Sequence, residues 1–250
     1  MKPSPRVARV LSVCALLALV CTALAVPSNA TSSSVPADER SESAPVAEVS
    51  RSNRLDAWGA EDRGSIDPAV LDLALGAVSC AVKSGTITDP STLTVIDYSR
   101  PSTAKRLWVF DLRGRTLLYE ELVAHGKGSG ENLPTLFSNE PDSHQSSLGL
   151  FLTEDTYVGR NGYSLRLRGL DVGYNDRAFE RAIVMHGAPY VSEEVARTTG
   201  RLGRSWGCPA LREGVARAVI DRVKGTGLVF AYYPDQRWLG SSRFLGGCAG

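Results

Sequence analysis

A succession of short β-type segments, separated by turn residues, constrains the fold of this 250-residue chain more than any other feature. Runs rich in β-branched and aromatic residues are typical of strands. We expect strands at 93–98, 106–111, 116–124, 147–153, 163–168, 181–186 and 228–233. The turn residues at 112–115 predict that the second and third strands form a hairpin. The fold class is therefore predicted to be mainly β with a few helices.

Three segments carry helix signals. A helix is expected near the start of the folded part, because Asp67 can cap it, Pro68 suits its first turn and an apolar face continues to Val82. A short helix is expected to begin at Ser192. A third is expected over 212–224, where apolar residues recur on one face and a glycine follows.

The N-terminal thirty residues have the layout of a secretory signal peptide. Basic residues are followed by an apolar run from Val10 to Val26 and then by small and polar residues up to Ala30, after which we expect cleavage. The alternative is an uncleaved membrane anchor, since the run is only just long enough to span. Residues 31–64 are polar and lack apolar periodicity, so they predict a flexible tether, and the folded domain is expected over 65–250.

The cysteines fit an exported protein. Cys14 and Cys21 would leave with the signal peptide, so Cys80, Cys208 and Cys248 remain. In an oxidising compartment this odd number favours one disulfide, between Cys80 and Cys248, with Cys208 free. The alternative leaves Cys80 buried on its helix and Cys248 unpaired in a glycine-rich tail. The formal net charge of +1 gives no indication of nucleic-acid binding.

A glycine-flanked cysteine downstream of a histidine is the main chemical signal. A thiol attacks carbonyls as the thiolate, so Cys208 needs a base such as His186 or a helix N-terminus to lower its pKa. Pro209 holds Cys208 in an extended loop, and the helix at 212–224 would point its positive end toward it. The N–H groups of Gly207 and Cys208 are the expected donors to an oxyanion. The alternative is a small buried cysteine without chemistry.

These residues carry a family resemblance. His186-Gly187 and Ser205-Trp206-Gly207-Cys208 resemble the signature of the L,D-transpeptidase (YkuD-type) catalytic domain. The likeness covers roughly residues 90–235, and it resembles the murein L,D-transpeptidase branch at 125–130, 137–139, 146–149, 164–167 and 203–205. The resemblance implies a YkuD-like β-sandwich catalytic domain preceded by a short helix. It also implies peptidoglycan stem peptides as substrate, and hence a periplasmic or other extracytoplasmic place at the cell wall.

The implied reaction is acyl transfer through a thioester. Cys208 would attack the L,D-peptide bond of a tetrapeptide stem and release D-alanine, and the amine of a second stem would then give a 3→3 cross-link. His186 would move the protons, oriented by a carboxylate or by the carbonyl of Gly187. An L,D-carboxypeptidase and a non-catalytic peptidoglycan-binding module are the alternatives. A papain-like enzyme is disfavoured, because it places cysteine before histidine.

Several further residues are candidates for substrate contact: Gly187, Arg204, Ser205, Trp206, His125 and Ser147. Arg204 suits a stem carboxylate. Trp206 stands where the commoner form of the signature has histidine, and we expect it to seal the core beside the nucleophile more readily than to stack on substrate. No cofactor or protein partner is predicted. A metal site is not expected either, because the histidines and cysteines lack ligand spacing.

Overall fold

The computed structural model describes residues 55–246 and 248. The predicted signal peptide, its cleavage point and most of the predicted tether lie outside this part of the chain. The elements are α2 (Pro68–Lys83), β1 (Thr92–Asp97), β2 (Leu107–Asp111), β3 (Thr116–Glu121), β4 (Val123–Ala124), β5 (Gly149–Gly159), β6 (Gly162–Gly169), β7 (Val184–Ala188), α3 (Glu193–Thr199), β8 (Ala210–Arg212), α4 (Glu213–Val223), β9 (Gly227–Tyr232) and α5 (Gln236–Ser241).

Local signals account for most of these boundaries. The Asp67 side chain accepts a hydrogen bond from the Ala69 N–H, with Pro68 in the first turn of α2. Ser192 caps α3 in the same way. The β2–β3 hairpin is confirmed by antiparallel pairing. Strand β8, helix α5 and the long extension of β5, which pairs with β6 as far as Gly159, were not predicted.

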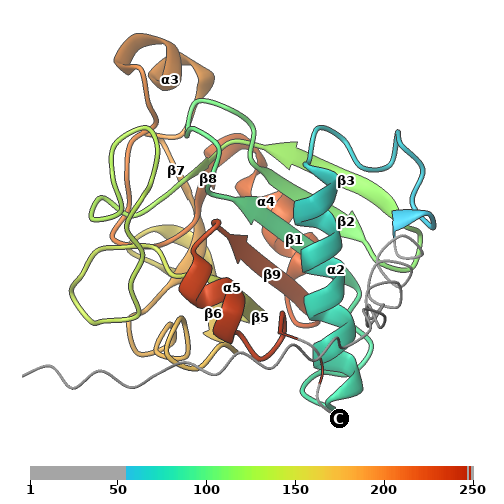
Figure 1. Ribbon diagram of the computed structural model, residues 1–250. Coiled ribbons are helices and arrows are strands. Elements are labelled where there is room, and N and C mark those ends of the chain that lie inside the picture. Colours follow the sequence, from blue (N-terminus) through green and yellow to red (C-terminus); the bar gives the residue numbers. More distant parts are fainter. Residues whose placement is uncertain (1–54, 247, 249–250) are drawn as a thin grey trace, which may run out of the picture. The chain divides into compact units, whose positions relative to one another are not determined.

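The nine strands of the described residues form one mixed sheet in the order β3-β2-β1-β9-β5-β6-β7-β8-β4 (Figure 1). The pairs β1–β9 and β7–β8 are parallel, and the remaining pairs are antiparallel. The two edge strands, β3 and β4, are consecutive in the chain and separated only by Leu122. The sheet must therefore curl until its edges nearly meet. The fold class is mainly β, as predicted.

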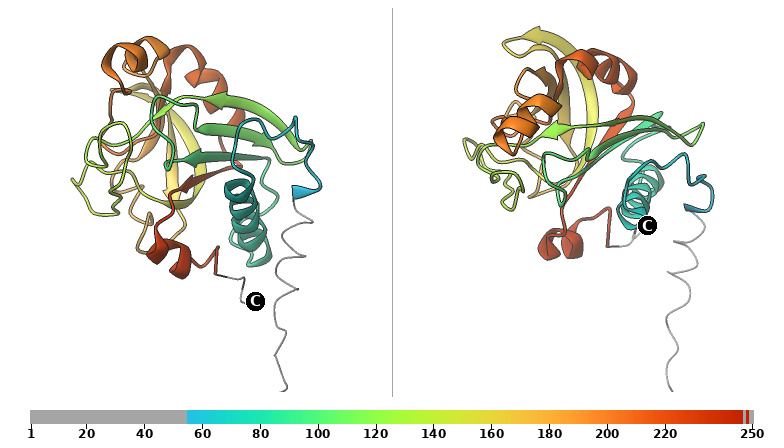
Figure 2. Two further views of the ribbon diagram at one scale, coloured as in Figure 1. Left: turned by 45° about the horizontal axis from the view of Figure 1, so that its top comes forward. Right: turned by 90° about the horizontal axis from the view of Figure 1, so that it is seen from above.

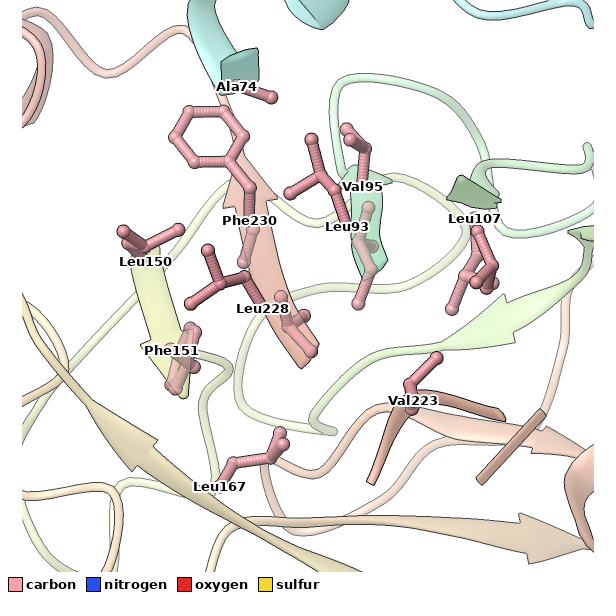
Figure 3. Packing of buried hydrophobic residues seen from close by; sticks show 14 of the residues in the cluster. Ala74, Leu93, Val95, Leu107, Leu150, Phe151, Leu167, Val223, Leu228 and Phe230 are labelled. Carbon is pink, nitrogen blue, oxygen red and sulfur yellow. The ribbon is translucent and has the colours of Figure 1, made fainter. Parts of the chain in front are cut away.

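Helices α2 and α4 cover opposite faces of the sheet (Figure 2). Strand β1 is buried along its whole length and β9 along most of it, which is the pattern of a parallel pair covered on both faces. Figure 3 shows Leu93 of β1 beside Leu228 and Phe230 of β9, with Ala74 of α2 next to Phe230. This core supports the strands that carry the candidate site.

The folded part begins earlier than predicted. The segment 55–64, expected to belong to the tether, contains Trp58, which is buried with its ring edge-on to Phe110 at 5.4 Å. A ten-residue segment whose large apolar residues are Leu55 and Trp58 gives a weak periodic signal. The burial of Trp58 depends on the distant strand that it meets. None of the helices within 55–246 is long and apolar enough to cross a membrane.

A disulfide joins Cys80 of α2 to Cys248 near the C-terminus. This is the pairing that the cysteine count favours. Cys208 is the free cysteine of the described residues.

Candidate active site

Two neighbouring parallel strands bring the candidate base and nucleophile into one pocket. His186 on β7 pairs in register with Ala210 of β8, and Cys208 lies just ahead of that residue. The pocket has a volume of about 460 Å³. Its lining consists of Tyr157, Arg160, Asn161, Arg181, Ala182, Val184, His186, Tyr190, Arg204, Ser205, Trp206 and Cys208. The topology thus joins two residues that are well separated in the sequence.

Cys208 is a buried thiol, 8% exposed. Its Sγ accepts from the Val184 N–H at 3.5 Å and donates to the Ala182 carbonyl at 3.7 Å. Burial raises the pKa of the Cys208 thiol above its ordinary value, while the Val184 N–H and the Arg181 guanidinium lower it. Because burial has the largest effect, the resting group is a thiol, and its conversion to thiolate requires a base.

His186 is held in a defined tautomer. Its Nδ1 lies 2.8 Å from the Gly187 carbonyl oxygen, which can only accept a hydrogen bond, so Nδ1 carries the proton and Nε2 has the free lone pair. Burial lowers the pKa of His186 below 6.5, so the ring is neutral at pH 7. Among the described residues, no hydrogen bond joins this ring to the Cys208 thiol. The base and nucleophile share a pocket without direct pairing.

The loop before Cys208 has an unusual backbone. Gly207 has φ +115°, and a Cβ there would lie 2.7 Å from the Gln145 carbonyl oxygen, so only glycine fits. The Gly207 N–H donates to Ser205 Oγ at 3.1 Å, and this hydroxyl donates to the Cys208 carbonyl at 2.6 Å. The expected oxyanion donor at Gly207 is therefore already engaged. The Cys208 N–H has no acceptor among the described residues.

A second loop braces the nucleophile loop through backbone contacts. The Ser205 N–H donates to the His125 carbonyl at 3.0 Å, and the Lys127 N–H donates to the Ser205 carbonyl at 2.8 Å. Gly126 sits between these contacts. A Cβ on Gly126 would lie 2.3 Å from the His144 carbonyl oxygen and 2.9 Å from Gly207. The close approach of three loops therefore explains this glycine.

His125 does not reach the pocket, contrary to the expectation of substrate contact. Its side chain is fully buried, with Nδ1 2.8 Å from Arg106 Nη2 and Nε2 3.3 Å from the Gly130 carbonyl oxygen. Arginine can only donate, so Nδ1 accepts and the ring is neutral. Burial and the neighbouring Arg106 lower the pKa of His125 to about 4. The residue joins the buried Arg106 to the loop that braces Ser205.

Trp206 lies at the pocket, but the expected core role is wrong, because the side chain is 64% exposed. Its ring centroid is 5.0 Å from that of His144, and the Lys127 ammonium lies over the ring at 5.2 Å. Lys127 belongs to the loop that braces Ser205, and His144 belongs to the third loop, which approaches Gly126. The residue offers a large aromatic surface beside the nucleophile.

The other predicted contact residues have partners within the protein. Arg204 lines the pocket and donates to the Gly130 carbonyl at 2.9 Å and to Glu131 at 2.7 Å. The buried Ser147 hydroxyl donates to the Ser138 carbonyl at 2.8 Å and lies outside the pocket lining. Gly187 serves His186 through its carbonyl group.

Arg181 lines the pocket but was not predicted as a site residue. It was expected in a strand over 181–186, whereas β7 begins at Val184 and Arg181 lies in the preceding turn. A single arginine near a strand gives no signal of its own.

The charged residues of the pocket are all basic. Among the described lining residues, Arg160, Arg181 and Arg204 carry positive charge, and no lining residue carries a carboxylate. Within the same part of the chain, no group of three or more His, Cys, Asp and Glu residues could hold a metal ion.

The chain matches a known protein family over most of its length. Residues 62–232 match the L,D-transpeptidase catalytic domain. Similar solved structures include an L,D-transpeptidase from Mycobacterium smegmatis (14% identity, 58% of this chain and 60% of that one, TM-score 0.37). Another is an L,D-transpeptidase from Stackebrandtia nassauensis (13% identity, 64% of this chain and 66% of that one, TM-score 0.34). The chain spans about 60% of the M. smegmatis structure, and no curated protein matches. The matched region covers most of the chain, which therefore belongs to the L,D-transpeptidase catalytic domain family.

Proposed function

We propose that this protein is a peptidoglycan L,D-transpeptidase that forms 3→3 cross-links through a thioester on Cys208. The observation that carries the proposal is the shared pocket of a free thiol and a neutral imidazole whose Nδ1 proton is held by the Gly187 carbonyl. That tautomer leaves the lone pair of Nε2 free to act as a base. Membership of the family supplies the substrate class.

In the acylation step, His186 Nε2 takes the Cys208 proton and the thiolate attacks the carbonyl carbon of the L,D-peptide bond of a tetrapeptide stem. The bond to the terminal D-alanine then breaks, and the imidazolium returns the proton to the leaving amine. The thiol must release the Ala182 carbonyl so that its proton can meet the imidazole. Such pairing commonly tightens only when substrate is bound.

In the second step, the acceptor amine of another stem attacks the thioester. His186 takes a proton from this amine, the carbon–sulfur bond breaks, and the sulfur recovers a proton from the imidazolium. The product is an amide between two stems. When water attacks in place of the amine, the same residues act as an L,D-carboxypeptidase.

Transition-state charge on the attacked oxygen needs nearby donors. The Cys208 N–H is available within the described part of the chain, whereas the Gly207 N–H must first release Ser205 Oγ. Loss of this one bond costs about 1 kcal/mol, which a charge-assisted bond to an oxyanion offsets. Gly207 therefore donates to the oxyanion only during the reaction, after it has released Ser205.

The charge of the pocket supports an anionic substrate. Three arginines line it with no carboxylate among the described lining residues, and guanidinium groups suit the carboxylates of stem peptides. Arg204 already pairs with Glu131, whereas Arg160 on the β5–β6 turn has no ion-pair partner in the described residues. Such a substrate places the protein outside the cytoplasm, in line with the predicted signal peptide.

The test uses the chain without its first thirty residues, incubated with a disaccharide-tetrapeptide and followed by mass spectrometry. Cross-linked dimer and released D-alanine are expected, and both should be absent in Cys208→Ala. His186→Gln should reduce both products while leaving the fold intact. Release of D-alanine without dimer would identify a carboxypeptidase. No product from the folded protein would favour the binding module.

A further inference from the structure

Arg181 reaches the nucleophile loop at Gly207. A Cβ at Gly207 would lie 3.4 Å from Arg181 Nη2, and the side chain lines the same pocket as Cys208. The next residue, Ala182, supplies the carbonyl that accepts from the thiol and has φ +53°. A left-handed conformation at a non-glycine residue is uncommon and marks a position held by its surroundings.

Four hydrogen bonds hold the guanidinium of Arg181. Nη1 donates to the Ser138 carbonyl at 2.7 Å and to Ser147 Oγ at 2.5 Å. Nη2 donates to Ser143 Oγ at 3.2 Å and to the Gln145 carbonyl at 2.7 Å. These partners come from the segments before and after the turn that contains His144, so the side chain is rigidly placed.

All four acceptors are neutral, so the positive charge of Arg181 is not cancelled by a bonded carboxylate. Glu140, the acidic side chain that raises the pKa of Arg181, forms its ion pair with Arg177 at 2.8 Å. Burial lowers the pKa of Arg181, whereas a negative charge on Cys208 raises it. A partly buried cation held by neutral dipoles gains most from a new anion nearby.

We propose that Arg181 is a positioning residue that stabilises the Cys208 thiolate when His186 removes the thiol proton. The inference rests on the proposed function, in which Cys208 is the nucleophile. The proton moves from Sγ to His186 Nε2, and the charge left on sulfur is stabilised by Arg181 and by the Val184 N–H at 3.5 Å. His186 is thus the base, and Arg181 is the resident counter-charge.

Other titratable groups near the thiol do not provide this counter-charge. The titratable or charged groups that line its pocket or act on it are Tyr98, Tyr157, Arg160, Arg181, His186, Tyr190 and Arg204. Arg160 lines the pocket from the β5–β6 turn, but Arg181 is the cation that lowers the pKa of the thiol. Tyr98 and Tyr190 are neutral at pH 7, because burial raises their pKa values above 10. His186 is neutral at rest, and the charge of Arg204 is paired with Glu131. Arg181 is thus the described cation that both acts on the thiol and has only neutral hydrogen-bond partners.

The experiment measures the reactivity of the Cys208 thiol without any peptidoglycan substrate. The full chain is alkylated with iodoacetamide from pH 6 to 10, and the labelled tryptic peptide 205–212 is quantified by mass spectrometry. Alkylation follows the thiolate fraction. Arg181→Gln is expected to slow labelling at neutral pH about tenfold, which corresponds to about one unit in the thiol pKa. Arg181→Lys, which keeps the charge, should restore most of the rate.

Two controls separate charge from structure. Arg177→Gln removes a neighbouring positive charge that lies outside the pocket lining, and it should leave the labelling profile unchanged. Ser147→Ala removes one hydrogen bond of Arg181 but keeps its charge, and it should also leave the profile close to that of the wild type. Circular dichroism identifies variants that have lost the fold.

The proposal is overturned if folded Arg181→Gln labels with the wild-type pH profile. If Arg181→Gln does not fold, Arg181→Lys decides: the proposal requires its thiol profile to stay within about threefold of the wild type, and a tenfold loss in folded Arg181→Lys contradicts it. A different outcome separates the two proposals. If Arg181→Gln slows labelling as expected but the wild-type protein forms no cross-linked product, the proposed function is refuted and the role of Arg181 stands.

Discussion

Replacement of Gly207 by alanine should destabilise the protein strongly, because two separate costs coincide. The backbone at φ +115° is a region that residues with a Cβ rarely adopt, at a cost of about 1–3 kcal/mol. The new Cβ would also lie 2.7 Å from the Gln145 carbonyl oxygen and 3.0 Å from Ile183 Cδ1. Overpacking of this kind costs about 1–3 kcal/mol. Gly207→Ala should therefore lower the free energy of unfolding by about 2–6 kcal/mol.

The measurement is urea unfolding followed by circular dichroism, with Gly200→Ala as the matched control. Gly200 ends α3 with φ +72°, and a Cβ there meets nothing within 4 Å. It therefore isolates the backbone cost, about 1–2 kcal/mol. If Gly207→Ala loses no more stability than Gly200→Ala, the close approach of the Gln145 carbonyl is not a constraint on the nucleophile loop. The reasoning about that loop would then be wrong.

Three further outcomes are expected. Cys80→Ser should lower stability by up to about 5 kcal/mol in the chain-entropy account, because the disulfide to Cys248 closes a separation of 168 residues; an unfolding midpoint that reductant does not move would contradict this. The folded-state pKa of His125, about 4, lies below its ordinary 6.5, so its contribution is fully present above about pH 6.5 and about 3 kcal/mol is lost as pH falls toward 4. His125→Gln should flatten that part of the stability profile. Trp206→Ala should slow cross-linking yet change stability by less than about 0.5 kcal/mol, as a melting curve will test, because the side chain is 64% exposed.

Signals confined to a few neighbouring residues predicted much of the fold. Asp67 and Pro68 mark the start of α2, and Ser192 marks the start of α3, because caps act within one helical turn. The β2–β3 hairpin follows from its turn residues. Strand β8 was missed because three residues, Ala210–Arg212, are too few to show a pattern. Trp58 was assigned to the tether because its partner, Phe110, lies far along the chain.

The sequence by itself determined the chemistry available to this protein: a free thiol, an upstream histidine and glycines where the chain must turn sharply. Only the tertiary structure decided what surrounds them. The parallel pairing of β7 with β8 places His186 and Cys208 in one pocket, and the loop contacts bury His125 while leaving Trp206 exposed. Hydrogen bonds to the Ser138 and Gln145 carbonyls hold Arg181 beside the nucleophile loop. Burial and charge at a site depend on which distant segments meet, and that is settled only when the sheet has closed around its core.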